Sequence, residues 1–479
     1  MTRNRSNDTG TTSRMSSSRG GASFPLGAPK KSVWFIIAIL CLAVGGFFIA
    51  RLLRTVTEEE KSPLPPAPLW SDPDPGAEPR EIAGHYKAEG LAVAKRLMKD
   101  FPGRADPILL MGQVHYGHGN STEAIRYWKE GLKLDPKRVD AYDGMGWIAL
   151  RKGDFETAVS HWRKALEIRP DMPGVGNSLA RALMGLGKVE EAIEALKKDL
   201  EISPRSSMSH FLLGQAYFQL EKYDKAREAY EKAIAIDPAC TNAYYNLARS
   251  LMKLRQTAKA REYMKTFQKL KAEDMKVLKS RNTAFDDMVN VRGLLATTHE
   301  DAGRIYRKYG RSRRAEEHWR RALVLDPKLT SCRVHLASLY ESTGRIAEAI
   351  RIHEELVELE PGNAVRYLAV ASLYVRVKRV PDAEKTLEKA IELTPKLSWG
   401  YRDLARLYLR TDENLSRAKA LAEKAVELEP SAANYNVLGW ALYANGEVAG
   451  SLAAMRRAIE LDPDNAEYKR RYVQIQQRQ

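Results

Sequence analysis

A short tripeptide ending in proline recurs along this chain at a nearly constant interval. It occurs nine times, for example as "LDP" at 134–136 and as "LEP" at 359–361. Successive prolines lie 33 to 35 residues apart, except for one gap of 89 residues between Pro238 and Pro327. A fixed period of this length predicts a stack of similar supersecondary units, each of which buries its apolar face on its neighbour.

Small and large residues recur at fixed positions within each period. If the proline is position 32, position 8 is glycine or alanine throughout and position 20 is alanine in most periods. Four periods have an aromatic residue at position 24: Trp128, Trp162, Tyr230 and Trp319. Small residues let two antiparallel helices approach closely, an aromatic ring fills the space opposite, and proline ends the second helix. Each period therefore predicts a helical hairpin.

Two periods that show the pattern fully are "AYDGMGWIALRKGDFETAVSHWRKALEIRP" and "SHFLLGQAYFQLEKYDKAREAYEKAIAIDP". In their order of Trp, Leu, Gly, Tyr, Ala, Phe, Ala and Pro they resemble tetratricopeptide repeats. The resemblance extends from about residue 105 to about residue 465 and includes ten units. It implies an all-α fold, a right-handed α-solenoid of antiparallel helix pairs, whose usual role is to bind other proteins.

The long gap between prolines divides the repeats into two groups. It equals two periods plus 21 residues, and Ala272 stands where a proline is expected. The helix there should therefore continue past Lys276. We expect a first array at 81–274 (a degenerate first unit or cap and five repeats), an insertion or hinge at 275–295, and a second array at 296–479 (five repeats and a C-terminal capping helix).

The N-terminal region differs from the repeats in composition. Residues 33–50 contain no charged side chain, and as a helix they would span roughly 27 Å, close to the thickness of a bilayer core. Bulky residues and Arg51 follow in place of a cleavage site, so a retained span is favoured over a secretion signal. We expect a disordered basic tail (1–31), a transmembrane helix (32–54, with residues 33–53 in the membrane) and a proline-rich linker (55–80).

Basic residues flanking the span predict its orientation. The first 31 residues contain six Lys or Arg and one acid, whereas Arg51 and Arg54 on the far side are followed by three glutamates. This bias predicts a cytoplasmic N-terminus with the repeats outside the cytoplasm, in the periplasm if the protein is bacterial. The alternative is that the repeats face the cytosol.

Motifs that would indicate an enzyme are absent from the sequence. It contains no glycine-rich phosphate loop, Gly-x-Ser-x-Gly, His-Glu-x-x-His or Cys-x-x-Cys. His115 and His118 are the most metal-like pair, but His115 occupies position 11, an aromatic core position in other units. We expect no catalytic residue, no metal and no cofactor. The net charge is +16, and about +11 is spread over 448 residues, which is too dilute to predict nucleic-acid binding.

The first helix of each repeat should line a concave groove through positions 5 and 9. Arginine and flat aromatic side chains at these positions favour the carboxylates and backbone of an extended acidic peptide. We expect this groove to bind proteins or peptides. The candidate residues are Gln113, Asp143, Trp147, Asn177, Arg181, Gln215, Tyr245, Arg249, Arg304, Arg402, Arg406 and Trp440.

A basic stretch, "RIYRKYGRSRRAEEHWRR" at 304–321, is either an anionic binding face or a solvated helix surface. Three functions remain open for the chain as a whole. The first is a membrane-anchored, non-catalytic scaffold that recruits partner proteins for assembly of an envelope complex. The second is a cytosol-facing receptor or co-chaperone for targeting sequences, and the third is a regulatory subunit of a separate transferase.

Overall fold

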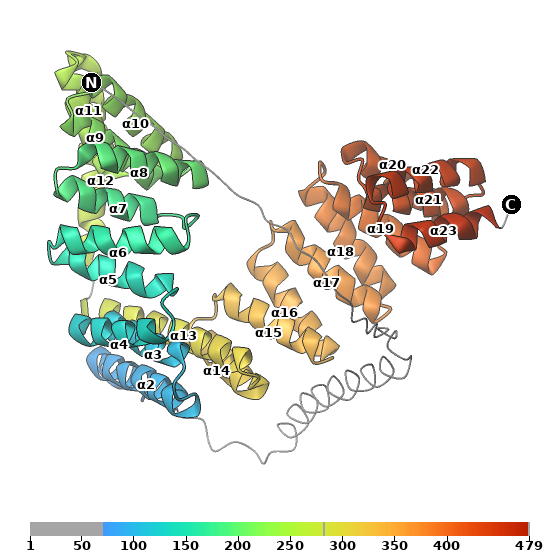
Figure 1. Cartoon of the computed structure of the whole chain (residues 1–479), viewed down its shortest axis with the longest axis horizontal. Helices are drawn as coiled ribbons and strands as arrows, with labels where there is room; N and C mark the ends of the chain where they lie inside the picture. Colours follow the sequence, from blue (N-terminus) through green and yellow to red (C-terminus); the bar gives the residue numbers. More distant parts are fainter. Residues whose placement is uncertain (1–69, 281–282, 478–479) are drawn as a thin grey trace, which may run out of the picture. The chain divides into compact units, whose positions relative to one another are not determined.

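The computed structural model describes residues 70–280 and 283–477, and all regular structure in this part is helical (Figure 1). The predicted tail, transmembrane helix and most of the linker lie outside the described residues. Within the described part, no helix has the length and apolar composition of a membrane span. The helices are α2 (Pro79–Asp100), α3 (Ala105–Gly117), α4 (Ser121–Leu134), α5 (Val139–Arg151), α6 (Phe155–Ile168), α7 (Val175–Gly185), α8 (Val189–Ile202), α9 (Ser207–Gln219), α10 (Tyr223–Ile236), α11 (Thr241–Lys253), α12 (Thr257–Ser280), α13 (Thr283–Lys308), α14 (Ser312–Leu325), α15 (Thr330–Ser342), α16 (Ile346–Leu359), α17 (Ala364–Arg376), α18 (Val380–Leu393), α19 (Ser398–Thr411), α20 (Leu415–Leu428), α21 (Ala432–Ala444), α22 (Val448–Leu461) and α23 (Ala466–Gln476).

Each repeat is a helical hairpin, as the periodicity predicts. Within each array, the first helix of a repeat (helix A, such as α3) packs on the second (helix B, such as α4), and helix B packs on helix A of the next repeat. The recurrent prolines follow the last residue of helix B by two positions, so no proline interrupts a helix B hydrogen-bond ladder. The result is the predicted all-α solenoid.

Small residues at position 8 make room for the aromatic ring at position 24. A Cβ atom on Gly146 would lie 2.7 Å from Cε2 of Trp162, and one on Gly214 would lie 2.5 Å from Cε1 of Tyr230. Both rings are almost completely buried. The contact is so close that only glycine fits without displacing the ring, which confirms the prediction of close helix approach.

The region of the long gap is helical on both sides of residues 281–282. Helix α12 continues to Ser280 and has 24 residues, and α13 begins at Thr283 and has 26, whereas other helices B and A have 11 to 14. The expected insertion at 275–295 therefore lies largely within these two long helices. The C-terminal part of α12, residues 271–278, is exposed.

The segment 81–104, expected as a degenerate unit or cap, contains the single helix α2, and this helix packs on both α3 and α13. Near the start of α2, Tyr86 shares a buried cluster with Val291 and Leu295 of α13. At its end, Asp100 accepts a hydrogen bond of 2.8 Å from the hydroxyl of Tyr306. The two helices therefore run in the same direction, and the first helix of the first array contacts the first helix of the second.

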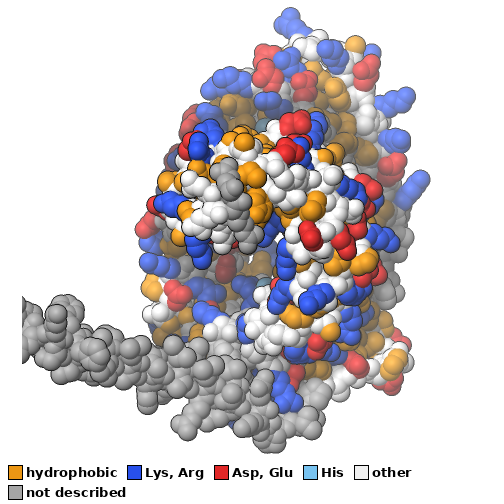
Figure 2. Space-filling view, turned by 90° about the vertical axis from the view of Figure 1, so that its right-hand side faces the viewer, with side chains coloured by type: hydrophobic (Ala, Val, Ile, Leu, Met, Phe, Trp, Pro, Cys, Tyr) orange, Lys and Arg blue, Asp and Glu red, His pale blue; other side chains and the backbone are white. Residues whose placement is uncertain are grey.

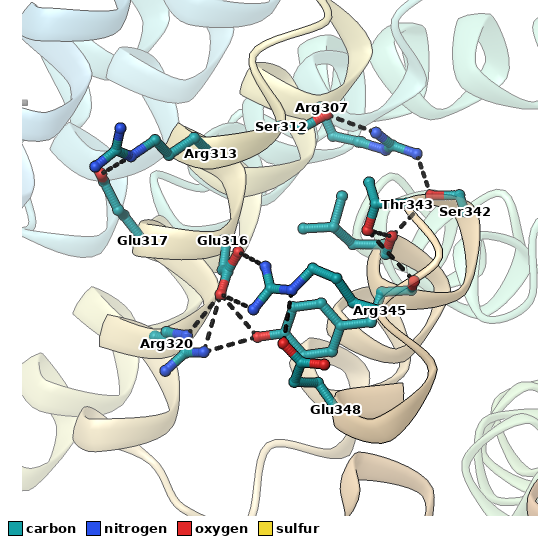
Figure 3. A network of polar contacts seen from close by, with 12 residues as sticks. Arg307, Ser312, Arg313, Glu316, Glu317, Arg320, Ser342, Thr343, Arg345 and Glu348 are labelled. Carbon is teal, nitrogen blue, oxygen red and sulfur yellow. Dashed lines mark hydrogen bonds and ion pairs between the residues drawn. The ribbon is translucent and has the colours of Figure 1, made fainter. Parts of the chain in front are cut away.

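A tyrosine–glutamate–arginine contact connects successive repeats of the second array. Tyr340 donates a hydrogen bond of 2.9 Å to Glu316 on the preceding helix B, and Arg345 donates one of 2.6 Å to the same carboxylate. Figure 3 shows Glu316 between Arg320 and Arg345. The Arg345 guanidinium also lies 4.2 Å from the centre of the Tyr340 ring. The same arrangement recurs with Tyr374, Glu354 and Arg379, and with Tyr408, Glu384 and Arg417.

Two glycines of α13 give a matched test of the close packing. A Cβ atom on Gly303 would lie 2.5 Å from Cδ1 of Trp319, whereas one on Gly293 would have no neighbour within 4 Å. We expect Gly303→Ala to lower the free energy of unfolding by about 1–3 kcal/mol because Trp319 must move. Gly293→Ala should raise it by about 0.5–1 kcal/mol because alanine favours the helix. Urea denaturation followed by circular dichroism measures both, and equal effects would contradict the packing argument.

Candidate functional site

All twelve predicted groove residues lie on helix A of their repeats. Six side chains are exposed and six are half-buried. The exposed ones are Gln113, Arg181, Tyr245, Arg249, Arg304 and Arg406, and the half-buried ones are Asp143, Trp147, Asn177, Gln215, Arg402 and Trp440. Helices α5, α7, α9 and α11 carry seven of them and are consecutive helices A, and each of them packs on the next.

In the first array, two arginines each lie over an aromatic ring of the preceding repeat, and one of them also lies near a ring of its own helix. The Arg181 guanidinium is 5.5 Å from the centre of the Trp147 ring. The Arg249 guanidinium is 4.7 Å from the Phe218 ring and 5.7 Å from the Tyr245 ring. Among residues 70–280 and 283–477, no carboxylate pairs with either arginine. The rings hold the two guanidinium groups in place and leave their N–H groups for another acceptor.

Asp143 has a partner within its own repeat and contributes to packing rather than to the groove. Its Oδ1 accepts a hydrogen bond of 2.8 Å from Nε1 of Trp162, the aromatic residue at position 24. Burial raises the pKa of this carboxyl group. Asn177 and Gln215 are half-buried between the arginine positions, and the side chain of Asn177 accepts a long hydrogen bond of 3.5 Å from Ser178.

In the second array, the predicted arginines have carboxylate partners on their own helices. Arg304 pairs with Asp301 at 2.9 Å, and both Arg402 and Arg406 pair with Asp403, at 3.1 and 3.7 Å. Trp440 lies under the guanidinium of Arg471, 5.4 Å from its ring centre. Each of these arginines therefore has a carboxylate within ion-pair distance, although Arg402 and Arg406 share one, whereas Arg181 and Arg249 have none among the described residues.

A cleft of about 930 Å³ lies where helices A of the two arrays face each other. Helices α3 and α5 line one side and α13 and α15 the other, and Gln113 and Arg304 are the two predicted residues in it. The indole rings of Trp128 and Trp319 also line it. The sequence does not predict this cleft, because its two sides belong to repeats almost 200 residues apart, which meet through contacts of α13 with α2 and with α3.

Charges of both signs line the cleft and are mostly paired with each other. Asp106 accepts hydrogen bonds from Arg138, Lys308 and Tyr309, at 2.5, 2.7 and 2.7 Å. These contacts join α3 to α13 and hold the pKa of Asp106 below its usual value despite burial. Partial burial raises the pKa of Asp301 to about 6, although 38% of its side chain is exposed and Arg304 opposes the shift.

Several side chains of the basic stretch 304–321 form ion pairs and hydrogen bonds with neighbouring helices. Lys308 and Arg321 bind carboxylates of α3 and α2. Arg307 donates hydrogen bonds to Ser312 (2.7 Å) and to Ser342 of the next repeat (2.8 Å), as Figure 3 shows. On the face seen in Figure 2, basic and acidic side chains are interspersed. Intramolecular contacts of this kind account for these basic residues without an external anion.

No group of three or more His, Cys, Asp or Glu side chains in the part of the chain described here could hold a metal ion. His115 stacks on the ring of Tyr127, with 5.4 Å between ring centres, and its Nδ1 is buried without a hydrogen-bond partner. Burial lowers the pKa of His115 and of His118. His115 thus occupies the packing position that its place in the repeat predicted.

Sequence profiles with the description "Tetratricopeptide repeat" match most of the repeat region. One matches residues 109–173, 177–239 and 300–364, and two others match 217–280, 342–407 and 432–465. Together they match well over half of the chain. The chain belongs to the tetratricopeptide repeat family. A search of curated protein sequences gave no match.

Solved structures similar to this tetratricopeptide repeat protein include MamA from Desulfovibrio magneticus RS-1, with 24% identity over 35% of this chain and 96% of that chain and a TM-score of 0.34. Yeast Tom70 has 18% identity over 78% of this chain and 96% of that chain, with a TM-score of 0.31. A thermophilic tetratricopeptide repeat protein from Thermus thermophilus has 20% identity over 38% of this chain and 98% of that chain, with a TM-score of 0.30. The family fold is typically a non-catalytic scaffold that binds proteins or peptides.

The raised pKa of Asp301 has a consequence for stability. The folded chain binds the Asp301 proton more tightly than the unfolded chain, whose pKa is near 3.8, so stability falls as pH rises from about 4 to 6. We expect Asp301→Asn to raise the urea midpoint fully above pH 6, with a gain that shrinks progressively between pH 6 and 4. The exposed Asp171→Asn serves as the control and should show no such pH-dependent gain. A gain that does not depend on pH would contradict the burial of an ionised Asp301.

Proposed function

We propose that this protein is a non-catalytic, membrane-anchored scaffold that gathers partner proteins in the assembly of an envelope complex. The observation that carries the proposal is the pair of arginines, Arg181 and Arg249, held over aromatic rings on the inner helices of the first array. Such groups suit carboxylates, because a guanidinium fork forms two parallel hydrogen bonds with one carboxylate. The partner is an extended acidic segment of another protein.

The spacing of the two arginines defines the segment further. Helix α9 packs between α7 and α11, which carry Arg181 and Arg249. Packed helices lie about 8–10 Å apart, so the two positions are roughly 20 Å apart. An extended chain covers that distance in about six residues. The segment that fits best therefore has two acidic residues separated by about five others.

The membrane part of the proposal rests on the sequence. The uncharged stretch 33–50 and the basic residues before it favour a retained span with the N-terminus in the cytoplasm and the repeats outside it. The linker between that stretch and Trp70 would then attach the repeats to the membrane surface. Nucleic acid is not a partner in this proposal, and no cofactor is needed.

Peptide binding tests the groove. The probe is a labelled peptide of twelve residues with two glutamates separated by five neutral residues, and the readout is fluorescence anisotropy with the full-length chain. We expect Arg181→Ala and Arg249→Ala each to weaken binding by about tenfold or more, because each removes a charge-assisted hydrogen bond. Arg406→Ala is the matched control and should have no effect, since Arg406 already pairs with Asp403. Equal binding of a peptide with lysines in place of the glutamates would contradict the proposal.

A topology reporter tests the location of the repeats. An enzyme that is active only outside the cytoplasm, fused after Gln479, should be active in cells that express the full-length chain. The same reporter fused to a chain lacking residues 1–54 should be inactive, because that chain has no segment to move the repeats across the membrane. Activity of a cytosol-specific reporter alone would place the repeats in the cytosol and contradict the envelope location. Peptide binding by the groove would still be tested separately, by the anisotropy experiment.

A further inference from the structure

Four polar side chains meet in the buried interface of α2, α13 and α14. They are Glu89 on α2, His299 on α13, and His318 and Arg321 on α14, with exposed fractions of 6%, 0%, 2% and 5%. Burial of two imidazoles beside an ion pair is costly unless every polar group has a partner. This cluster is distinct from both the groove and the cleft.

The hydrogen bonds form a continuous chain through the cluster. Arg321 donates from Nε to Oε1 and from Nη2 to Oε2 of Glu89, both at 2.9 Å. Nε2 of His299 lies 2.9 Å from Glu89 Oε1, and Nδ1 of His299 lies 2.9 Å from Nδ1 of His318. Two facing ring nitrogens can form a hydrogen bond only if one of them carries a proton and the other does not. With both imidazoles neutral, His318 donates to His299 and His299 donates to Glu89, so these contacts are satisfied.

The segment before α2 covers the cluster. The Trp70 ring lies against both imidazoles, with centre distances of 4.9 Å to His299 and 5.1 Å to His318. Asp72 accepts a hydrogen bond from Nη1 of Arg321. The start of the described chain and α2 are thus attached to α13 and α14 by the same few groups.

A further proton, added to the two that the neutral histidine pair already carries, would have no acceptor to bind. On His318 it would face the rings of Trp70 and Tyr306, the latter stacked at 5.1 Å, with His299 and the positive charge of Arg314 nearby and no carboxylate of the described residues in contact. Burial and these positive neighbours hold the pKa of His318 well below 6.5. For His299 burial also lowers the pKa, but the Glu89 carboxylate opposes the shift. Protonation of His318 therefore destabilises the closed interface more than protonation of His299 does.

The contacts of α2 also determine how the two arrays meet. Its end binds α13 through Asp100 and Tyr306, and the next residues lead directly into α3, which forms one wall of the cleft. Removal of α2 from α13 would expose the buried cluster of Tyr86, Val291 and Leu295. The α3 wall would then be held to α13 only by its own contacts, such as those of Asp106 with Lys308 and Tyr309. The state of the histidine pair is thereby coupled to the cleft.

We propose that the Glu89–His299–His318–Arg321 cluster is a proton-operated latch, in which protonation of His318 releases α2 from α13 and α14 and opens the cleft between the arrays. This device goes beyond the proposed scaffold function, since the groove residues of α5 to α11 are not part of it. It would make access to the cleft depend on the pH of the compartment.

The size of the effect follows from linkage. A histidine that stays neutral in the closed state but titrates near 6.5 when released favours the open state as pH falls. Between pH 7.5 and 5.5 the opening constant should rise by about tenfold for one such histidine. His299 adds less, because Glu89 compensates its charge. Below about pH 4.5 protonation of Glu89 would weaken the latch further.

Hydrogen exchange of the full-length chain tests the latch. Backbone exchange of α2 is measured at pH 7.5 and 5.5, corrected for the intrinsic effect of pH, and compared with α20, which contains no histidine. We expect exchange of α2 and of the facing part of α13 to rise by about tenfold relative to α20 at pH 5.5. Unchanged relative exchange, or an equal rise in every helix, would overturn the proposal.

Variants separate the latch from general acid sensitivity. His318→Gln cannot take up a proton and should lose most of the acid response, whereas the half-buried His161→Gln on α6 should keep it. Glu89→Gln should open α2 already at pH 7.5, because Arg321 loses its bidentate partner. If His318→Gln does not fold, the pH dependence of exchange in the wild type and the exchange of Glu89→Gln at pH 7.5 still test the proposal. If α2 of the Glu89→Gln variant is as protected from hydrogen exchange as in the wild type, the cluster does not hold α2 on α13 and α14, and the proposal is wrong.

Discussion

The packing of a small residue at position 8 against a large side chain at position 24 is the contact on which the rest of this structure depends. It lets helix A approach helix B closely enough to bury rings such as Trp162 and Trp319 almost completely. Within each array such hairpins stack because each exposes an apolar face that the next one covers. Positions 5 and 9 then lie on the inner helices at regular intervals, which is what makes a groove possible.

The docking of α2 on α13 changes what this regular stack can do. A uniform solenoid would contact only successive repeats, but here the first helix of one array contacts the first helix of the other through Glu89, Asp100 and Tyr306. Two surfaces result that no single repeat contains: a cleft between facing helices A and a buried cluster that includes two histidines. The basic residues Lys308 and Arg321 of the stretch 304–321 bind carboxylates of α3 and α2 at this junction.

The candidate groove shows where residue type alone is insufficient. Arg181 and Arg304 occupy the same position in their repeats, yet Arg181 lies over Trp147 and Arg304 pairs with Asp301. The difference arises from neighbours, an aromatic ring on the preceding helix A in one case and an aspartate three residues earlier in the other. Asp143 likewise accepts a hydrogen bond from Trp162 and contributes to packing. Periodicity predicts which positions line the groove, and only the surroundings decide which of their side chains lack a carboxylate partner.

The sequence by itself determined the helical hairpins, their number and their small-to-large packing, because these follow from contacts that repeat every 34 residues and are local in the chain. It also places the uncharged stretch 33–50 next to a basic tail. Only the tertiary structure decided that α2 contacts α13, that a cleft lies between the arrays, and that Glu89 meets His299. These contacts join residues about 200 positions apart, and because they occur once, no periodic pattern encodes them.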